Sequence, residues 1–147
     1  MPTLHPFAIH FPLALLLTST LFTLLALRPE GAAWAKSSYH CLLVGWLSGV
    51  LAMITGVADA TRQVAGPDTL YGHEVVRLVN AHAFASLAAM GCYGVAFLRL
   101  RRCPDLLGDP AMRRGYIGLH ALGAALLLLG GWLGGRLVYG WGLGVGG

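Results

Sequence analysis

Six histidines are the residues of this chain best suited to chemistry, because most of them lie in or beside long apolar stretches. Ionisable side chains are rare inside a membrane and usually serve a function there. The histidines fall at or near the starts of four such stretches. The first and third stretches carry His5, His10, His73 and His82, and the second and fourth carry His40 and His120.

The pair His10 and His82 has the chemistry needed to hold a haem. Neutral imidazole is the axial ligand of b-type haem, and bundles draw such ligands from facing helices. At about 1.5 Å per residue, His10 lies about 6 Å along the first helix and His82 about 14 Å along the third, so a shared depth is allowed. We therefore expect His10 and His82 to be the axial ligands of a haem b.

Three further residues are expected to support these ligands. Arg77, near the start of the third stretch, is expected to pair with a haem propionate. Asp59, at the end of the second, is expected to hold the other nitrogen of a ligating imidazole, and His5 is a further residue of this site. A second haem, held by His40 and His120, is a weaker alternative.

Composition identifies the elements that must position these residues. Charged residues make up only 11% of the chain and apolar residues 56%, against about 25% charged residues in a soluble globular protein. This composition excludes a soluble enzyme, a disordered tail and a nucleic-acid-binding protein. Four runs contain no Asp, Glu, Lys or Arg, namely residues 1–27, 37–58, 78–98 and 115–135.

Each run is longer than the ~20 residues that an apolar helix needs to cross a bilayer. The sequence therefore predicts an all-α fold, a bundle of four transmembrane helices that forms one domain over residues 1–147. The predicted helices cover about 6–27, 39–60, 75–98 and 115–137.

The basic residues predict the orientation of this bundle. Short loops rich in Lys and Arg remain in the cytoplasm. The connections after the first and third helices hold seven of the ten basic residues, namely Arg28, Lys36, Arg99, Arg101, Arg102, Arg113 and Arg114. We therefore expect both termini on the periplasmic side of a bacterial inner membrane.

Glycines spaced four residues apart predict close helix packing, because small residues let helix backbones approach in lipid. One such pair is in the second helix and two are in the fourth. The pairs are Gly45/Gly49, Gly130/Gly134 and Gly131/Gly135. The faces they form pack within the bundle, or they make room for a flat cofactor or a partner subunit.

Motifs at the head and tail of the chain carry a family resemblance. They are His5-Pro6-x-x-x-His10-Phe11-Pro12, Gly56-x-x-Asp59, and Gly131-Trp132-Leu133-Gly134-Gly135-x-Leu137-Val138-Tyr139 followed by Gly144-Val145-Gly146. With these motifs the chain resembles the bacterial membrane proteins grouped as domain of unknown function twenty-two thirty-one. The resemblance implies that His82 matches a family histidine, whereas His40 and His120 have no counterpart. Some members are fused or adjacent to Rieske-type and cytochrome domains, which implies redox work.

We expect a haem-binding membrane subunit that transfers electrons within or beside a larger redox or photosynthetic complex, and the residues leave open whether it also catalyses a reaction. Its expected partners are lipid and the other membrane subunits of that complex, with no nucleic acid. Two alternatives stay open. One is a cofactor-free accessory subunit that packs through its glycine-rich faces, and the other is a small proton or solute conductor.

Overall fold

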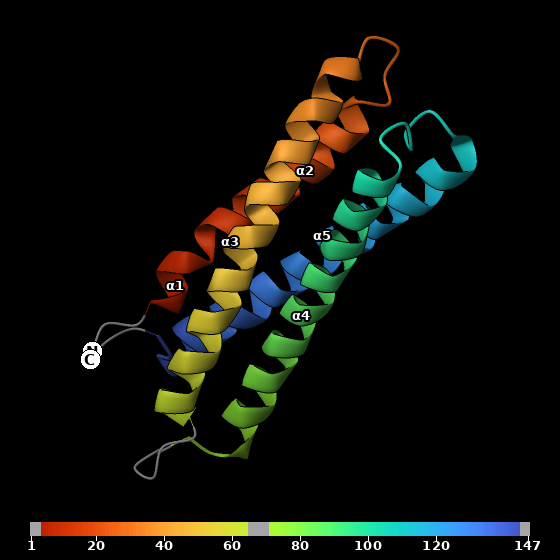
Figure 1. Ribbon diagram of the computed structural model, residues 1–147. Helices are drawn as coiled ribbons and strands as arrows, with labels where there is room; N and C mark the ends of the chain where they lie inside the picture. Colours follow the sequence, from red (N-terminus) through yellow and green to blue (C-terminus); the bar gives the residue numbers. More distant parts are fainter. Residues whose placement is uncertain (1–3, 65–70, 145–147) are drawn as a thin grey trace.

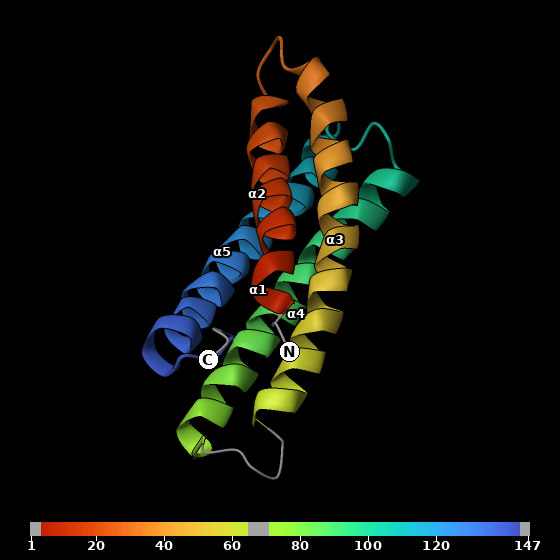
Figure 2. The ribbon, with the colours of Figure 1, turned by 90° about the vertical axis from the view of Figure 1, so that its left-hand side faces the viewer.

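The computed structural model describes residues 4–64 and 71–144, and within these ranges all regular structure is helical. The long helices lie side by side, with the α2–α3 and α4–α5 connections at one end of the bundle and the start of α1 toward the other (Figure 1). A view turned by 90° shows the same arrangement (Figure 2). The helices are α1 (His5–Ala8), α2 (His10–Leu25), α3 (Ala32–Val64), α4 (His73–Arg102) and α5 (Pro110–Trp141).

The two short N-terminal helices form one crossing with a local break at Ile9. Pro12 has no N–H to donate to the carbonyl of Ala8, so the regular hydrogen-bond pattern is interrupted there. Taken as one span from His5 to Leu25, this segment joins α3, α4 and α5 as the four spans among the described residues that are long and apolar enough to cross a membrane. The predicted all-helical fold with four such spans is confirmed.

α3, α4 and α5 extend further than the charge-free runs predict, whereas the first crossing ends at Leu25, two residues before its predicted end. α3 begins at Ala32 instead of near residue 39, and α5 continues to Trp141. The charge-free runs measure the part of a helix that suits hydrocarbon, whereas a helix can continue through charged residues once it reaches water. Asp109 caps the early start of α5, since its carboxylate accepts hydrogen bonds from the backbone N–H groups of Ala111 and Met112.

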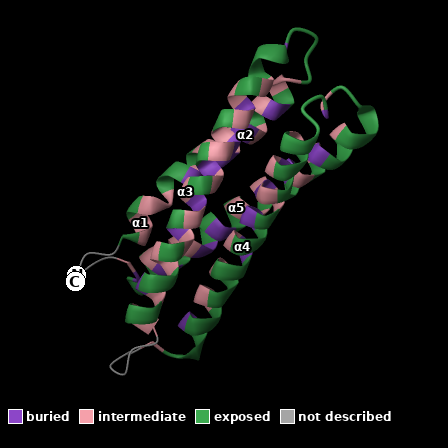
Figure 3. Ribbon diagram, in the orientation of Figure 1, coloured by how far each residue is buried: buried purple, intermediate pink, exposed green. Residues whose placement is uncertain are grey.

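The bundle places apolar side chains outside and several polar ones inside, the arrangement expected when the surrounding medium is lipid. Phe7 and Phe84 are 78% and 71% exposed. In Figure 3 the buried positions lie mainly where helices face one another. The buried polar and charged side chains of the described chain are Ser19, Thr23, Ser38, Asp59 and His120.

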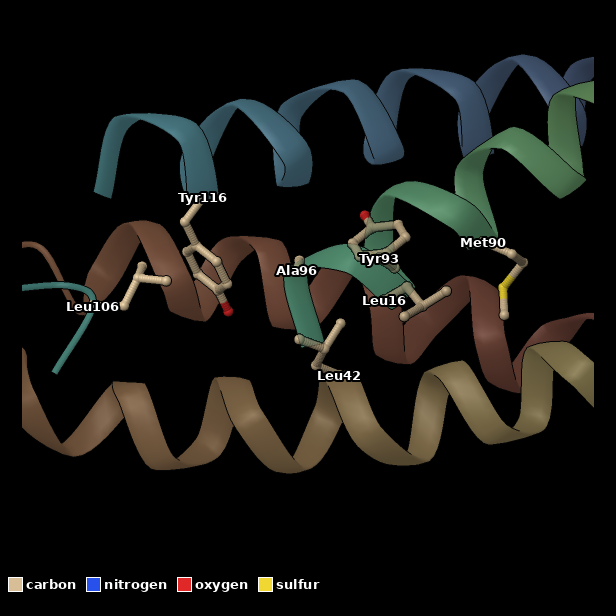
Figure 4. Packing of buried hydrophobic residues seen from close by; sticks show 7 residues of the cluster. All are labelled: Leu16, Leu42, Met90, Tyr93, Ala96, Leu106 and Tyr116. Carbon is tan, nitrogen blue, oxygen red and sulfur yellow. The ribbon is translucent and has the colours of Figure 1, made fainter. Parts of the chain in front are cut away.

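The most extensive helix contacts are those of α4 with α5 and of α2 with α3. Figure 4 shows the apolar cluster that joins the helices at the bundle centre. Its buried members are Leu16, Leu42, Met90, Tyr93, Ala96, Leu106 and Tyr116. The main core therefore lies away from His5 and His82, toward the end that carries the α2–α3 and α4–α5 connections.

The glycine pairs divide between interior and surface. A Cβ at Gly45 would meet Leu16 of α2, and one at Gly130 would meet Ser86 of α4. A Cβ at Gly131 or Gly135 would lie in open space. One face of α5 therefore uses its glycines for packing inside the bundle, and the Gly131/Gly135 face is turned outward.

Candidate functional site: a histidine pair between α1 and α4

The position of His5 is fixed first through its backbone. The N–H groups of Leu4 and His5 each donate to Oδ2 of Asp59 at 2.9 Å. These N–H groups lie at the start of α1, where a helix has no backbone acceptors for them. Asp59, near the end of α3, is only 6% exposed, and its Oδ1 lies 3.4 Å from the guanidinium of Arg62. A carboxylate from α3 therefore anchors the first turn of the first span.

The imidazole of His5 is fixed separately. Its Nδ1 lies 2.8 Å from the carbonyl oxygen of Ala52 in α3. A carbonyl oxygen only accepts hydrogen bonds, so Nδ1 must carry the proton and donate it. In the neutral ring, Nε2 then has a free lone pair.

His82 is held in the same way from the other side of the bundle. Its Nδ1–H donates to the carbonyl oxygen of Gly130 in α5 at 2.8 Å, which again leaves Nε2 with a free lone pair. The centroids of the His5 and His82 rings are 5.9 Å apart, with an angle of 77° between the ring planes. Two half-buried imidazoles in the same tautomer thus face each other between α1 and α4.

Two glycines give these rings their space. A Cβ at Gly56 would lie 2.9 Å from Cε1 of His5, and a Cβ at Gly134 would lie 3.1 Å from Cε1 of His82. Any larger residue would have to displace a ring that is already hydrogen-bonded. Spacing alone did not assign these roles, although Gly56 lies in the Gly56-x-x-Asp59 motif and Gly134 in the tail motif of the sequence.

The structure brings His82 together with His5, not with His10, as its partner from the first crossing. His10 is exposed on the surface of the bundle, and its Nδ1 lies 3.2 Å from the carbonyl of Phe7 in its own segment. The predicted pair is His10 with His82, and in the structure the residue of the first crossing that lies beside His82 is His5.

The predicted supporting residues also take different places. Asp59 holds the backbone of His5, not a ring nitrogen. Oδ2 accepts both backbone N–H groups and Oδ1 forms an ion pair with Arg62. The ring nitrogens of His5 and His82 are held by backbone carbonyls instead. Arg77 is exposed on α4, five residues before His82.

The inner histidines are not brought together as a ligand pair. His40 is exposed and lies beside Tyr39. His120 is buried, with its Nδ1 3.1 Å from Oγ1 of Thr20 and its ring against Tyr93 and Tyr116. His120 therefore belongs to a polar network in the core, and its Nε2 has no hydrogen-bond partner among the residues described.

Within residues 4–64 and 71–144, no group of three or more His, Cys, Asp or Glu side chains is arranged to hold a metal ion. The histidine pair supplies two nitrogen ligands. It therefore suits a metal that brings further ligands with it, or a metal ion that needs only two ligands.

The fold and the site together define an all-helical membrane protein with four spans and a histidine pair between the first and third. The chain belongs to the family of predicted membrane proteins DUF2231, which matches residues 1–147. The resemblance drawn from the head and tail motifs is thereby confirmed. No curated protein and no solved structure matches the chain.

Proposed function

We propose that this protein is a membrane subunit that holds a b-type haem between α1 and α4, with His5 and His82 as axial ligands. The observation that carries the proposal is the hydrogen bond that both rings make in the same way. Each donates Nδ1–H to a backbone carbonyl at 2.8 Å, the arrangement that orients a ligating imidazole and raises its basicity. His5 replaces His10 in this proposal.

The spacing of the rings agrees with one metal between them. With metal–nitrogen bonds of about 2 Å, two imidazoles on opposite sides of one ion have ring centroids about 6 Å apart, and the observed separation is 5.9 Å. A porphyrin would supply the remaining four nitrogen ligands. Arg62 and Arg77, both exposed near this end of the bundle, have the charge to pair with propionates.

In this role the haem supplies one-electron transfer, and the chain positions it. The proposed setting is a bacterial inner membrane, within or beside a larger redox or photosynthetic complex whose other membrane subunits would contact this bundle. The end with His5 and His82 is assigned to the periplasm because most Lys and Arg residues lie toward the other end.

The test is the visible spectrum of full-length protein purified from haem-replete cells, before and after dithionite. We expect a Soret band and a reduced α band in the wild type. Both should be lost in His5→Ala and His82→Ala and kept in His10→Ala, the matched control from the same crossing. Size-exclusion elution identifies variants that remain folded.

Two results contradict the proposal. A folded but colourless wild type excludes the haem. Loss of the bands in His10→Ala, with retention in His5→Ala, assigns the ligand to His10 instead.

A cofactor-free accessory subunit is the second candidate, and one observation favours it. The rings of His5 and His82 already contact each other and bond to the carbonyls of Ala52 and Gly130. They therefore also serve as polar contacts that hold the four spans together. This candidate predicts a colourless protein in which His82→Ala lowers thermal stability.

A further inference from the structure

A cavity of about 420 Å³ lies at the other end of the bundle, where the α2–α3 and α4–α5 connections are. Its volume falls within the ~300–1,000 Å³ typical of small-molecule sites. Residues of α2, α3, α4 and α5 line it, so all four spans contribute to it.

The inner wall of the cavity is formed by three buried residues that carry hydroxyl groups, Thr23, Ser38 and Tyr116. The hydroxyls of Thr23 and Ser38 bond to each other at 2.7 Å. The Tyr116 side chain extends from α5 toward α3 (Figure 4), and its hydroxyl lies beside those of Thr23 and Ser38. These buried hydroxyls are turned toward one another, so a ligand in the cavity would contact mainly the outer and apolar walls.

The outer wall carries positive charge. Lys36 and Arg101 both line the cavity and are exposed. The Arg101 guanidinium is positioned by the ring of Phe97, 5.8 Å from its centroid. Among the described residues that line the cavity, none carries a carboxylate. The charge of the cavity therefore favours an anion. The remaining wall is largely apolar, including Leu100 and Leu107.

We propose that this cavity binds the phosphate-bearing headgroup of an anionic phospholipid. Lys36 and Arg101 would pair with the phosphodiester, and the acyl chains would lie along the apolar wall. Basic pockets between membrane helices bind anionic lipid headgroups in this manner. The site is separate from the histidine pair and does not depend on the proposed haem.

The experiment is a titration of delipidated full-length protein in detergent, followed by native mass spectrometry. The three added molecules are dioleoyl phosphatidylglycerol, dioleoyl phosphatidylcholine and soluble glycerol 3-phosphate. We expect one tightly bound phosphatidylglycerol, with at least tenfold weaker binding of the other two.

The decisive variants replace the two basic residues of the outer wall. The double variant Lys36→Gln/Arg101→Gln should weaken binding about thirtyfold. Its control, Arg28→Gln/Arg102→Gln, has the same charge change outside the lining and should stay within about threefold.

The proposal is overturned if phosphatidylcholine binds as tightly as phosphatidylglycerol, or if the lining double variant Lys36→Gln/Arg101→Gln binds phosphatidylglycerol like the wild type. Equal affinity for glycerol 3-phosphate would assign the cavity to a phosphate anion from water and would exclude the lipid.

Discussion

The rings of His5 and His82 face each other at 5.9 Å, although they come from the first and third crossings of the bundle. Each ring is oriented by a carbonyl from a different helix, Ala52 of α3 for His5 and Gly130 of α5 for His82. All four spans therefore meet at this pair, either directly or through the groups that orient it.

Replacing Gly134 by alanine should disturb this pair, because the new Cβ would lie 3.1 Å from Cε1 of His82. Overpacking of this kind costs about 1–3 kcal/mol, so we expect a lower unfolding temperature in detergent. The matched control is Gly135→Ala, whose Cβ would meet nothing within 4 Å. Equal stability of the two variants would contradict the close contact with His82.

Asp59→Ala should destabilise the chain by about 1–3 kcal/mol, because it leaves the N–H groups of Leu4 and His5 without their acceptor. Asp59→Asn should cost less, since an amide oxygen still accepts both hydrogen bonds and only the attraction to Arg62 is lost. Thermal unfolding gives the ranking, and hydrogen exchange at the His5 amide gives the cause. Unchanged exchange at that amide in Asp59→Ala would show that the carboxylate does not anchor α1.

Thr20→Val should weaken the core network. Oγ1 of Thr20 lies 2.9 Å from the Tyr93 hydroxyl and 3.1 Å from Nδ1 of His120, so the isosteric change leaves both groups without this partner. We expect a loss of about 1–3 kcal/mol in the free energy of unfolding. Thr61→Val removes only an exposed hydrogen bond within α3 and should be neutral to about 0.5 kcal/mol. The network proposal fails if both substitutions have the same effect.

The number and type of crossings could be predicted from the charge-free runs. In a chain with so few charged residues, a run of about 20 residues without charge indicates a helix that crosses a membrane. The helix ends could not be predicted from the same signal. Lys36 and Arg102 lie inside α3 and α4, since the charge-free run ends at the membrane surface and the helix does not.

The identity of the first-crossing histidine depends on tertiary structure. His5 and His10 are five residues apart, which places them on different faces at 3.6 residues per turn, and only one face can meet α4. The break at Ile9 and the attachment to Asp59 direct His5 inward. The spacing of nearby residues in the sequence predicts neither the break nor the attachment. It also does not predict that the Gly130 carbonyl orients His82.

The attachment of α1 to Asp59 also sets an order of events during biogenesis. The head of the first crossing gains its acceptor only after the whole of α3 has been synthesised, and His82 gains the Gly130 carbonyl only once α5 is in place. The histidine pair is therefore completed at the last step of insertion. Both rings are held by their backbone acceptors only in the complete bundle, so the fourth crossing gives the pair its final geometry.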